Sequence, residues 1–305
     1  MQKEMKLFPK ASAKAQSAME YLMTYGWAIL VIAIVLAALF QLGVFSSASF
    51  APKAPRGSCQ VFRPNGPGTT SFISTEGECN GELPQYVASF TSAPYTQQLV
   101  YVNGLGSNPS MTVSEWVLVS PLHNTGDWQA VAGPVVQGTD CTGQHTFLSI
   151  QPNLQPGIWG GCDDWWPLPS INPGVWYFLA YTYNTSSKVI TFYENGNSTS
   201  ASTSMSFNSV AMNQFDIGNA DNGNVGQTDF YGYITNVQYY NTTLSSSEIQ
   251  ALYLEGIGGA PIDLQNLVAW WPLNGNANDY SGNNNNGVPN GVTYTSNWYS
   301  GYSAP

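Results

Sequence analysis

The stretch "GVWYFLAYTYN" (174–184) and the segment "KVITFYENGN" (188–197) that follows it decide the fold. Apolar and polar side chains alternate along both segments, as in strands that bury one face. The string "ENGN" (194–197) contains an Asn-Gly pair, which is a strong signal for the tight turn of a β-hairpin. The two segments therefore predict neighbouring antiparallel strands, with a hairpin turn at the end of the second.

The same alternation recurs on both sides of these segments and predicts further strands, bounded by turns rich in Asn and Gly. These strands are expected in "SMTVSEWVLV" (110–119), "FDIGNADNGN" (215–224) and "FYGYITNVQYY" (230–240). One helix is expected in "LSSSEIQALYLEG" (244–256), because Ser245 and Glu248 form a capping box and Gly256 ends the pattern. Many strands and one short helix predict an all-β fold, a sandwich of two antiparallel sheets.

This body, from residue 84 to about residue 295, resembles a LamG-like jelly roll, the concanavalin A-like lectin/glucanase sandwich. The segments quoted above carry the resemblance, together with "LVAWWPLNGNANDYSGNNNNG" (267–287). In the family that last segment usually opens the domain, whereas here it comes last. The resemblance therefore implies a circularly permuted domain, in which the C-terminal segment supplies the strand that normally comes first. The alternative is the incomplete start of a second repeat.

A second signal lies at the N-terminus, where a short basic leader precedes a long apolar run. The run extends from Tyr21 to Phe45, and no charged residue occurs between Glu20 and Lys53. It exceeds the roughly 20 apolar residues that a helix needs to cross a bilayer. Because the basic residues lie on its N-terminal side, it predicts one transmembrane helix whose N-terminus is cytoplasmic.

This N-terminus resembles the class III signal peptide of archaeal type IV pilin-like proteins, in which a basic leader is cut just ahead of the hydrophobic helix. The resemblance implies cleavage between Ala15 and Gln16, after the pair Lys14-Ala15, so that Glu20 becomes the fifth mature residue. If the leader is cut, Glu20 is expected to pair with the new amino group of a neighbouring subunit as the helices assemble. The alternative is that Glu20 stays at the level of the lipid headgroups, beside the positive end of its own helix.

Four segments are therefore expected along the chain. They are a leader (1–15), a transmembrane or filament-core helix (16–47), a Pro- and Ser-containing stalk with a Cys-bounded loop (48–83), and the LamG-like domain (84–305). All four cysteines lie after the helix, and an even number in an exported chain favours two disulfides. Short loops rich in Gly and Pro favour the pairing Cys59–Cys79 and Cys141–Cys162. Zinc is the alternative, but no CxxC spacing supports it.

The net charge of the chain and its N-glycosylation sequons indicate which partners and which location to expect. The chain has 18 acidic and 8 basic residues and a net charge of −10, which argues against nucleic acid or anionic lipid as a ligand. Three Asn-x-Ser/Thr sequons, at Asn184, Asn197 and Asn241, are candidate N-glycosylation sites. Both features fit a domain that faces the outside of the cell.

Two pairs of tryptophans are candidate sugar-binding residues, since sugar rings stack on aromatic rings while Asn, Asp and Gln bind their hydroxyl groups. The candidates are Trp270 with Trp271 and, in the string "CDDWW", Asp163, Asp164, Trp165 and Trp166. Adjacent residues of a strand point to opposite faces. One tryptophan of each pair is therefore expected in the core.

The LamG resemblance also points to calcium in the loop "NGNANDYSGN" (274–283). Asn276, Asn278 and Asp279 supply oxygen ligands there, and Asp216 is a candidate distant contributor. Ca²⁺ usually takes about 6–8 oxygen ligands and more charge than one aspartate gives. The alternative is an Asn/Asp turn whose side chains hydrogen-bond their own backbone.

The sequence does not predict an enzyme. Glycoside hydrolysis needs two carboxylates about 5–10 Å apart, and the ExDxxE string that laminarinase-type enzymes carry on one strand of this fold does not occur. Glu76, Glu78 and Glu82 lie outside the matched strands, and His123 and His145 have no Ser/Asp constellation nearby. Phosphate- and dinucleotide-binding fingerprints are also missing from the sequence.

These features together predict an adhesin-like protein, located in the cell membrane with an extracellular domain or in a surface filament. The expected partners are the membrane, other pilin-like subunits through the N-terminal helix, and glycans or the surface of another cell. A structural subunit without a ligand and a glycoside hydrolase are the two alternatives.

Overall fold

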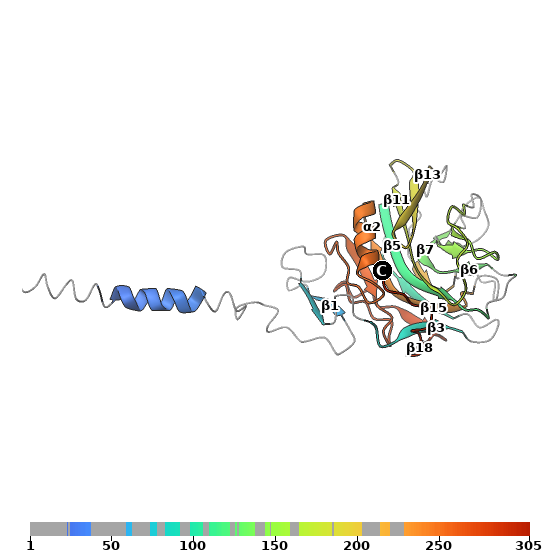
Figure 1. Ribbon diagram of the computed structural model, residues 1–305. Coiled ribbons are helices and arrows are strands. Elements are labelled where there is room, and N and C mark those ends of the chain that lie inside the picture. The colour runs from blue at the N-terminus through green and yellow to red at the C-terminus, as the bar shows by residue number, and fades with distance from the viewer. Residues whose placement is uncertain are drawn as a thin grey trace, which may run out of the picture. The chain divides into compact units, whose positions relative to one another are not determined.

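The computed structural model describes two compact units, Met1–Pro52 and Lys53–Pro305, drawn in Figure 1. The described residues are 23, 25–37, 59–62, 74–77, 83–91, 98–105, 110–122, 126, 128–137, 144–146, 148–158, 165–184, 186–202, 214–219 and 229–305. Lys14, Ala15, Gln16 and Glu20 lie outside them, so the predicted cleavage and the role of Glu20 stay predictions.

In the first unit, residues 25–37 form a helix within the predicted helical segment. Every described residue of this helix is exposed, and Tyr25, Trp27 and Ile29 each expose about two thirds of their surface, at 65%, 68% and 66%. Apolar side chains therefore cover the helix on all sides. Within the described residues, no helix has both the length and the apolar character required to span a membrane.

The second unit is built around the predicted central hairpin. Strands β11 (Trp176–Asn184) and β12 (Val189–Glu194) pair antiparallel, from Asn184 opposite Val189 to Leu179 opposite Glu194. The turn that follows β12 has positive φ at both Asn195 (48°) and Gly196 (79°), as a type I′ turn requires. Hence the turn predicted from "ENGN" is confirmed.

A larger sheet extends from this hairpin, and all its pairings are antiparallel. In spatial order its described strands are β13 (Asn197–Ser202), β12, β11, β5 (Ser110–Val119), β15 (Gly232–Tyr240), β3 (Val87–Phe90) and β18 (Thr293–Thr295), and β16 (Leu267–Trp271) also pairs with β15. Strand β5 has the predicted limits, and β15 falls within its predicted segment.

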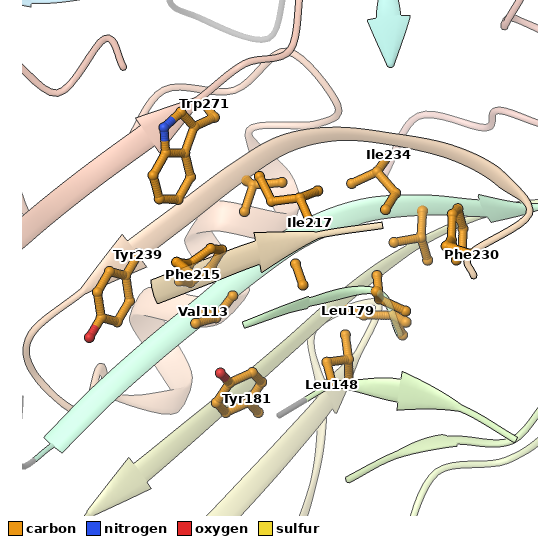
Figure 2. Packing of buried hydrophobic residues seen from close by; sticks show 14 of the residues in the cluster. Val113, Leu148, Leu179, Tyr181, Phe215, Ile217, Phe230, Ile234, Tyr239 and Trp271 are labelled. Atoms are coloured by element: carbon orange, nitrogen blue, oxygen red, sulfur yellow. The ribbon is translucent and has the colours of Figure 1, made fainter. Parts of the chain in front are cut away.

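A smaller sheet packs against one face of the larger sheet. Its strands, in spatial order, are β17 (Val288–Asn290), β4 (Leu99–Asn103), β14 (Gln214–Ile217), β7 (Ala132–Gln137) and β8 (Gln144–Thr146). Apolar side chains of both sheets fill the space between them, as Figure 2 shows for Val113, Leu179, Phe215 and Ile217. The two layers confirm the predicted antiparallel sandwich.

The strand expected over 215–224 is shorter than predicted. It ends at Ile217, because Gly218 has a φ of 90° that side-chain-bearing residues rarely adopt. A Cβ at Gly218 would also collide with the ring of Phe90 on β3. Residues 220–224 lie outside the described part of the chain.

The opposite face of the larger sheet is covered by the helix α2 (Ser246–Leu254) and by the C-terminal residues (Figure 1). Ser245 accepts a hydrogen bond from the backbone N–H of Glu248, whose carboxylate accepts one from the N–H of Ser245. The predicted capping box is thus confirmed. Ile249 and Leu252 point into a second apolar cluster that includes Trp116 and Phe178.

The C-terminal segment contributes strands to both sheets. Strand β16 pairs with β15 and β18 pairs with β3 in the larger sheet, whereas β17 pairs with β4 in the smaller one. The segment is therefore an integral part of this sandwich, as a permuted domain requires. Two further small sheets occur among the described residues: β1 (Cys59–Phe62) with β2 (Ser74–Gly77), and β10 (Pro156–Gly157), β9 (Ser149–Ile150) and β6 (Gln129–Ala130).

Candidate functional site

The two tryptophans of "CDDWW" point to different environments. Trp165 pairs with Ile158 through two backbone hydrogen bonds of 2.8 and 3.1 Å, and its ring packs edge-on against Phe192 with 5.3 Å between ring centroids. Trp166 instead contacts Trp128, with ring centroids 5.2 Å apart and planes inclined by 50°. One member of the pair thus packs on the core, as predicted, and the other does not. Asp163 and Asp164 lie outside the described residues.

A tight loop at residues 151–155 supports Trp166. Gln155 donates its side-chain N–H to the backbone oxygen of Trp166 at 2.8 Å, and Gln151 donates to Oε1 of Gln155 at the same distance. Leu154 has a φ of 65°, which is uncommon for a residue with a side chain. Unusual backbone of this kind occurs most often at functional sites. The Gln155 amide, itself held by Gln151, therefore anchors the backbone of Trp166 to this loop.

Gly157 leaves the space that the tryptophan pair needs. A Cβ at this position would lie 2.6 Å from Cε3 of Trp166 and would also collide with the backbone oxygen of Trp165. No larger residue fits there without displacing both tryptophans.

We call Trp128 and Trp166 the aromatic corner. Both residues are half-buried, and Asn153 on the supporting loop is exposed. An open indole beside amide side chains can stack on the apolar face of a sugar ring while uncharged polar groups bind its hydroxyls. Sequence reasoning missed Trp128, because only the fold brings residue 128 beside residue 166.

Trp270 and Trp271 are not available to a ligand. Trp270 is 1% exposed and belongs to the cluster under α2, where its indole N–H donates to Oδ1 of Asn236 at 2.7 Å. Trp271 is fully buried between the sheets and donates to the backbone oxygen of Asn285 at 2.8 Å. As sugar-binding candidates both are therefore wrong, because both faces of β16 are covered.

The Asp279 carboxylate accepts four hydrogen bonds from the chain itself. Oδ1 accepts from the backbone N–H groups of Trp270 and Ser281 at 2.9 and 2.8 Å, and Oδ2 accepts from the N–H of Asn285 and the hydroxyl of Ser281, both at 2.8 Å. These bonds tie the loop to β16. The arrangement matches the alternative of an Asn/Asp turn.

The other calcium candidates also have contacts within the chain. Oδ1 of Asn276 accepts the N–H of Asn278 at 2.9 Å, and Oδ1 of Asp216 accepts from Gln214 at 2.7 Å. Asp216 belongs to β14 in the smaller sheet, whereas Asp279 is bonded to β16 in the larger one. No group of three or more His, Cys, Asp or Glu side chains that could hold a metal occurs among the described residues. Calcium binding stays a prediction.

Glu115 is an acidic residue in the interior that sequence reasoning did not single out. It lies in the middle of β5, opposite Leu179 of β11, and is fully buried on the face between the two sheets. Neither carboxyl oxygen has a hydrogen-bond partner among the described residues. Because burial disfavours the charged form, the pKa of Glu115 is raised well above its usual range.

Two residues on the strands beside Glu115, Glu194 and Tyr181, also have raised pKa values. Leu179 lies between Glu115 and Glu194 in one cross-strand row, and burial also raises the pKa of the half-buried Glu194. The pKa of Tyr181 is raised by burial and, to a smaller extent, by Glu115. Figure 2 shows Tyr181 next to Val113, its partner on β5. The only signal for this arrangement in the sequence was the acidic residue inside the strand "SMTVSEWVLV".

The remaining predicted sites are described in part. Asn197 and Asn241 are exposed, and Oδ1 of Asn184 accepts hydrogen bonds from the N–H groups of Ser186 and Ser187 at 2.9 and 3.1 Å. The backbone of Cys59 belongs to β1, that of Glu76 to β2 and that of His145 to β8. Cys79, Cys141, Cys162, Glu78, Glu82 and His123 lie outside the described residues. The disulfide pairing and the glycosylation stay predictions.

Comparison with known proteins defines the class of the domain. Residues 87–250 match the Laminin G family model described as the concanavalin A-like lectin/glucanases superfamily. The match covers more than half of the chain, so the chain belongs to this superfamily. A search of curated proteins finds no match.

Solved structures share the fold at low sequence identity. A Bacteroides ovatus protein proposed to bind carbohydrate is 16% identical, with a TM-score of 0.50 over 79% of this chain and 70% of that chain. A heptameric SAP-like pentraxin from Limulus polyphemus is 14% identical, with a TM-score of 0.51 over 69% and 94%. The CBM40 of the Ruminococcus gnavus IT-sialidase, bound to α2,3-sialyllactose, is 12% identical, with a TM-score of 0.41 over 52% and 95%. At these identities the likeness is one of fold.

Proposed function

We propose that the sandwich is a lectin-like module that binds carbohydrate at the aromatic corner. The contact between the half-buried residues Trp128 and Trp166 is the observation that carries this proposal, and the amide of Gln155 anchors the backbone of Trp166 beside it. Membership of the lectin/glucanase superfamily supports the same conclusion. Of the two tryptophans in "CDDWW", Trp166 is proposed to contact the ligand, because the ring of Trp165 packs on Phe192.

Binding without catalysis is the activity that we propose, and the positions of Glu115 and Asp279 agree with it. A glycosidase needs two carboxyl groups that face each other across an accessible sugar. Glu115 is fully buried, and both carboxylate oxygens of Asp279 accept hydrogen bonds from the loop. Neither residue can reach a glycosidic bond in this structure.

The N-terminal helix is proposed to attach the module to the cell surface, either in the membrane or in a pilin-like filament. A helix that is apolar on every side requires an apolar environment, which lipid or neighbouring helices provide. Residues 25–37 have this character. Cleavage between Ala15 and Gln16 and pairing of Glu20 with a neighbouring amino group belong to the filament form of this proposal.

A glycan array tests the carbohydrate proposal. The full chain, kept in a mild detergent and fluorescently labelled, is expected to bind a subset of saccharides in a manner that the free saccharide competes away. If no saccharide on a broad array gives competable binding, the domain is a structural subunit rather than a lectin.

Protein isolated from its own cells tests whether the N-terminal helix is processed and assembled as proposed. Mass spectrometry of the chain from its own membrane should find Gln16 as the first residue, and Glu20→Ala should lower the yield of filaments while leaving the sandwich folded. Glu4→Ala, inside the leader, is the matched control and should have no effect on yield. An intact Met1 in the mature protein would contradict the pilin-like form and leave a plain anchor.

A further inference from the structure

We propose that the aromatic corner selects an uncharged hexopyranose at the end of a saccharide chain and excludes sialic acids and uronic acids. This inference rests on the proposed carbohydrate binding and names the class of ligand. Two independent observations carry it: the distribution of charge along the chain and the inclination of the two indole rings.

The charge distribution bears on anionic sugars. Between residues 84 and 305 the chain has thirteen acidic residues and a single basic one, Lys188, and no arginine follows Arg63. A sugar carboxylate is bound most effectively by the two parallel N–H groups of an arginine. The sandwich offers no such partner, and its negative potential repels an anionic ligand.

Lys188 does not compensate for the missing arginines. It lies in the turn between β11 and β12, with a φ of 54°, next to Ser187, whose backbone N–H donates to Oδ1 of Asn184. The aromatic corner is built instead on the small sheet of β6, β9 and β10 and on the loop of residues 151–155. The polar groups on that loop are the amides of Gln151, Asn153 and Gln155, which carry no charge.

The inclination of the rings limits how much of a saccharide can stack. A flat polysaccharide surface needs aromatic rings that lie in one plane and are spaced along the chain. Trp128 and Trp166 instead touch each other, with centroids 5.2 Å apart and planes at 50°. Such a pair offers the face of one indole ring for stacking, and the second indole closes one side of that face. This arrangement fits one terminal sugar ring.

Paired glycans test the charge argument. An array that carries neutral glycans beside the same glycans capped with α2,3-linked sialic acid should give signal from the neutral members. Capping should reduce the signal by roughly tenfold or more, since it both covers the terminal ring and adds a carboxylate. A preference for the capped glycans would overturn the inference on charge.

Matched substitutions test the position of the site. Trp166→Ala and Trp128→Ala should each weaken binding of the best neutral glycan by roughly fivefold to tenfold, whereas Trp166→Phe should retain part of the affinity. Tyr299→Ala is the control, because Tyr299 is an aromatic residue with 53% of its surface exposed on the other face of the larger sheet. Thermal unfolding of each variant verifies that the sandwich is folded.

These experiments distinguish a failure of the proposed carbohydrate binding from a failure of the proposed site. If the wild-type chain binds no saccharide, the proposed function fails and this inference fails with it. If the wild-type chain binds a neutral glycan and Trp166→Ala, shown to be folded, binds it equally well, carbohydrate binding stands and the assignment of the site is overturned.

Discussion

The indole of Trp298 joins the two ends of the sandwich by donating a 3.1 Å hydrogen bond to the backbone oxygen of Pro84, 214 residues earlier in the chain. The backbone oxygen of Trp298 in turn accepts the indole N–H of Trp176 at 2.9 Å. Trp298 is 1% exposed and lies in the apolar cluster shared with α2. The Trp298 side chain therefore adds a link between the beginning and the end of the domain, which the pairing of β3 with β18 also joins.

Trp298→Ala is accordingly expected to lower the free energy of unfolding by about 3–5 kcal/mol, because it leaves a large cavity and removes a buried hydrogen bond. Denaturant unfolding followed by tryptophan fluorescence measures the change. The neighbouring Tyr299 stacks on Trp298 but is 53% exposed, so Tyr299→Ala should cost less than about 1.5 kcal/mol. Equal losses for the two variants would contradict the role given to Trp298.

Gly157→Ala is expected to weaken saccharide binding although residue 157 itself does not contact the ligand. The added methyl group would displace Trp165 and Trp166, between which it has no space. Overpacking of this kind costs about 1–3 kcal/mol of stability. Titration of the full chain with the best glycan from the array measures the affinity, and unchanged affinity would show that the corner tolerates movement. Gly26→Ala, in the helix of residues 25–37, is the control for ligand binding, because nothing lies within 4 Å of the added Cβ.

The stability of the protein should depend on pH through Glu115. Burial raises the folded-state pKa of Glu115 above its unfolded value of about 4.3, so the folded chain binds the proton more tightly. The stabilisation that tighter binding of this proton gives the folded chain is fully present below about pH 4. It is lost as the pH rises through the folded-state pKa. An apolar side chain in place of the unpaired carboxyl does not titrate, so this loss of stability with rising pH disappears.

Glu115→Met should therefore raise the free energy of unfolding at pH 7 by about 1–3 kcal/mol and by less at pH 4. Thermal or denaturant unfolding across this range measures the difference. Glu194 is a graded control: it is only half-buried and its pKa is raised by the same cause, so Glu194→Met should give a smaller gain. A Glu115→Met variant that is less stable than the wild type at pH 7 would show that the carboxyl has a partner when the protein is in solution.

Asp279→Ala should destabilise the sandwich by about 2–4 kcal/mol, since it leaves backbone N–H groups of Trp270, Ser281 and Asn285 without their acceptor. The conservative change Asp279→Asn should cost less, because an amide oxygen replaces one acceptor. The same contacts predict that removing calcium with EDTA leaves the thermal midpoint of the wild type unchanged. A midpoint that falls with EDTA and recovers with Ca²⁺ would instead establish the metal site predicted from the loop.

The sequence was most informative where local chemistry determines the structure. The alternation in residues 110–119 predicted β5 with its observed limits, and the Ser245–Glu248 pair predicted the start of α2. Both features depend on residues within a few positions of each other. Local patterns of this kind can be recognised without knowledge of the fold.

Features that depend on long-range packing could not be predicted in this way. Trp270 and Trp271 are both buried because the smaller sheet covers one face of the larger sheet, while α2 and the C-terminal residues cover the other. A simple alternation between core and solvent therefore does not hold on β16. The contact of Trp128 with Trp166 and the burial of Glu115 likewise arise only from the assembled sandwich.

The position of β3 has a mechanical consequence for a domain attached through its N-terminal side. A pull directed along β3 would load a strand that is hydrogen-bonded laterally to β15 on one side and to β18 on the other. Such a load stretches the bonds of both pairings at the same time, in shear, rather than opening them one after another. If the sandwich is anchored through its N-terminal side as proposed, traction would be shared between two neighbouring strands and the Trp298 contact rather than carried by β3 alone.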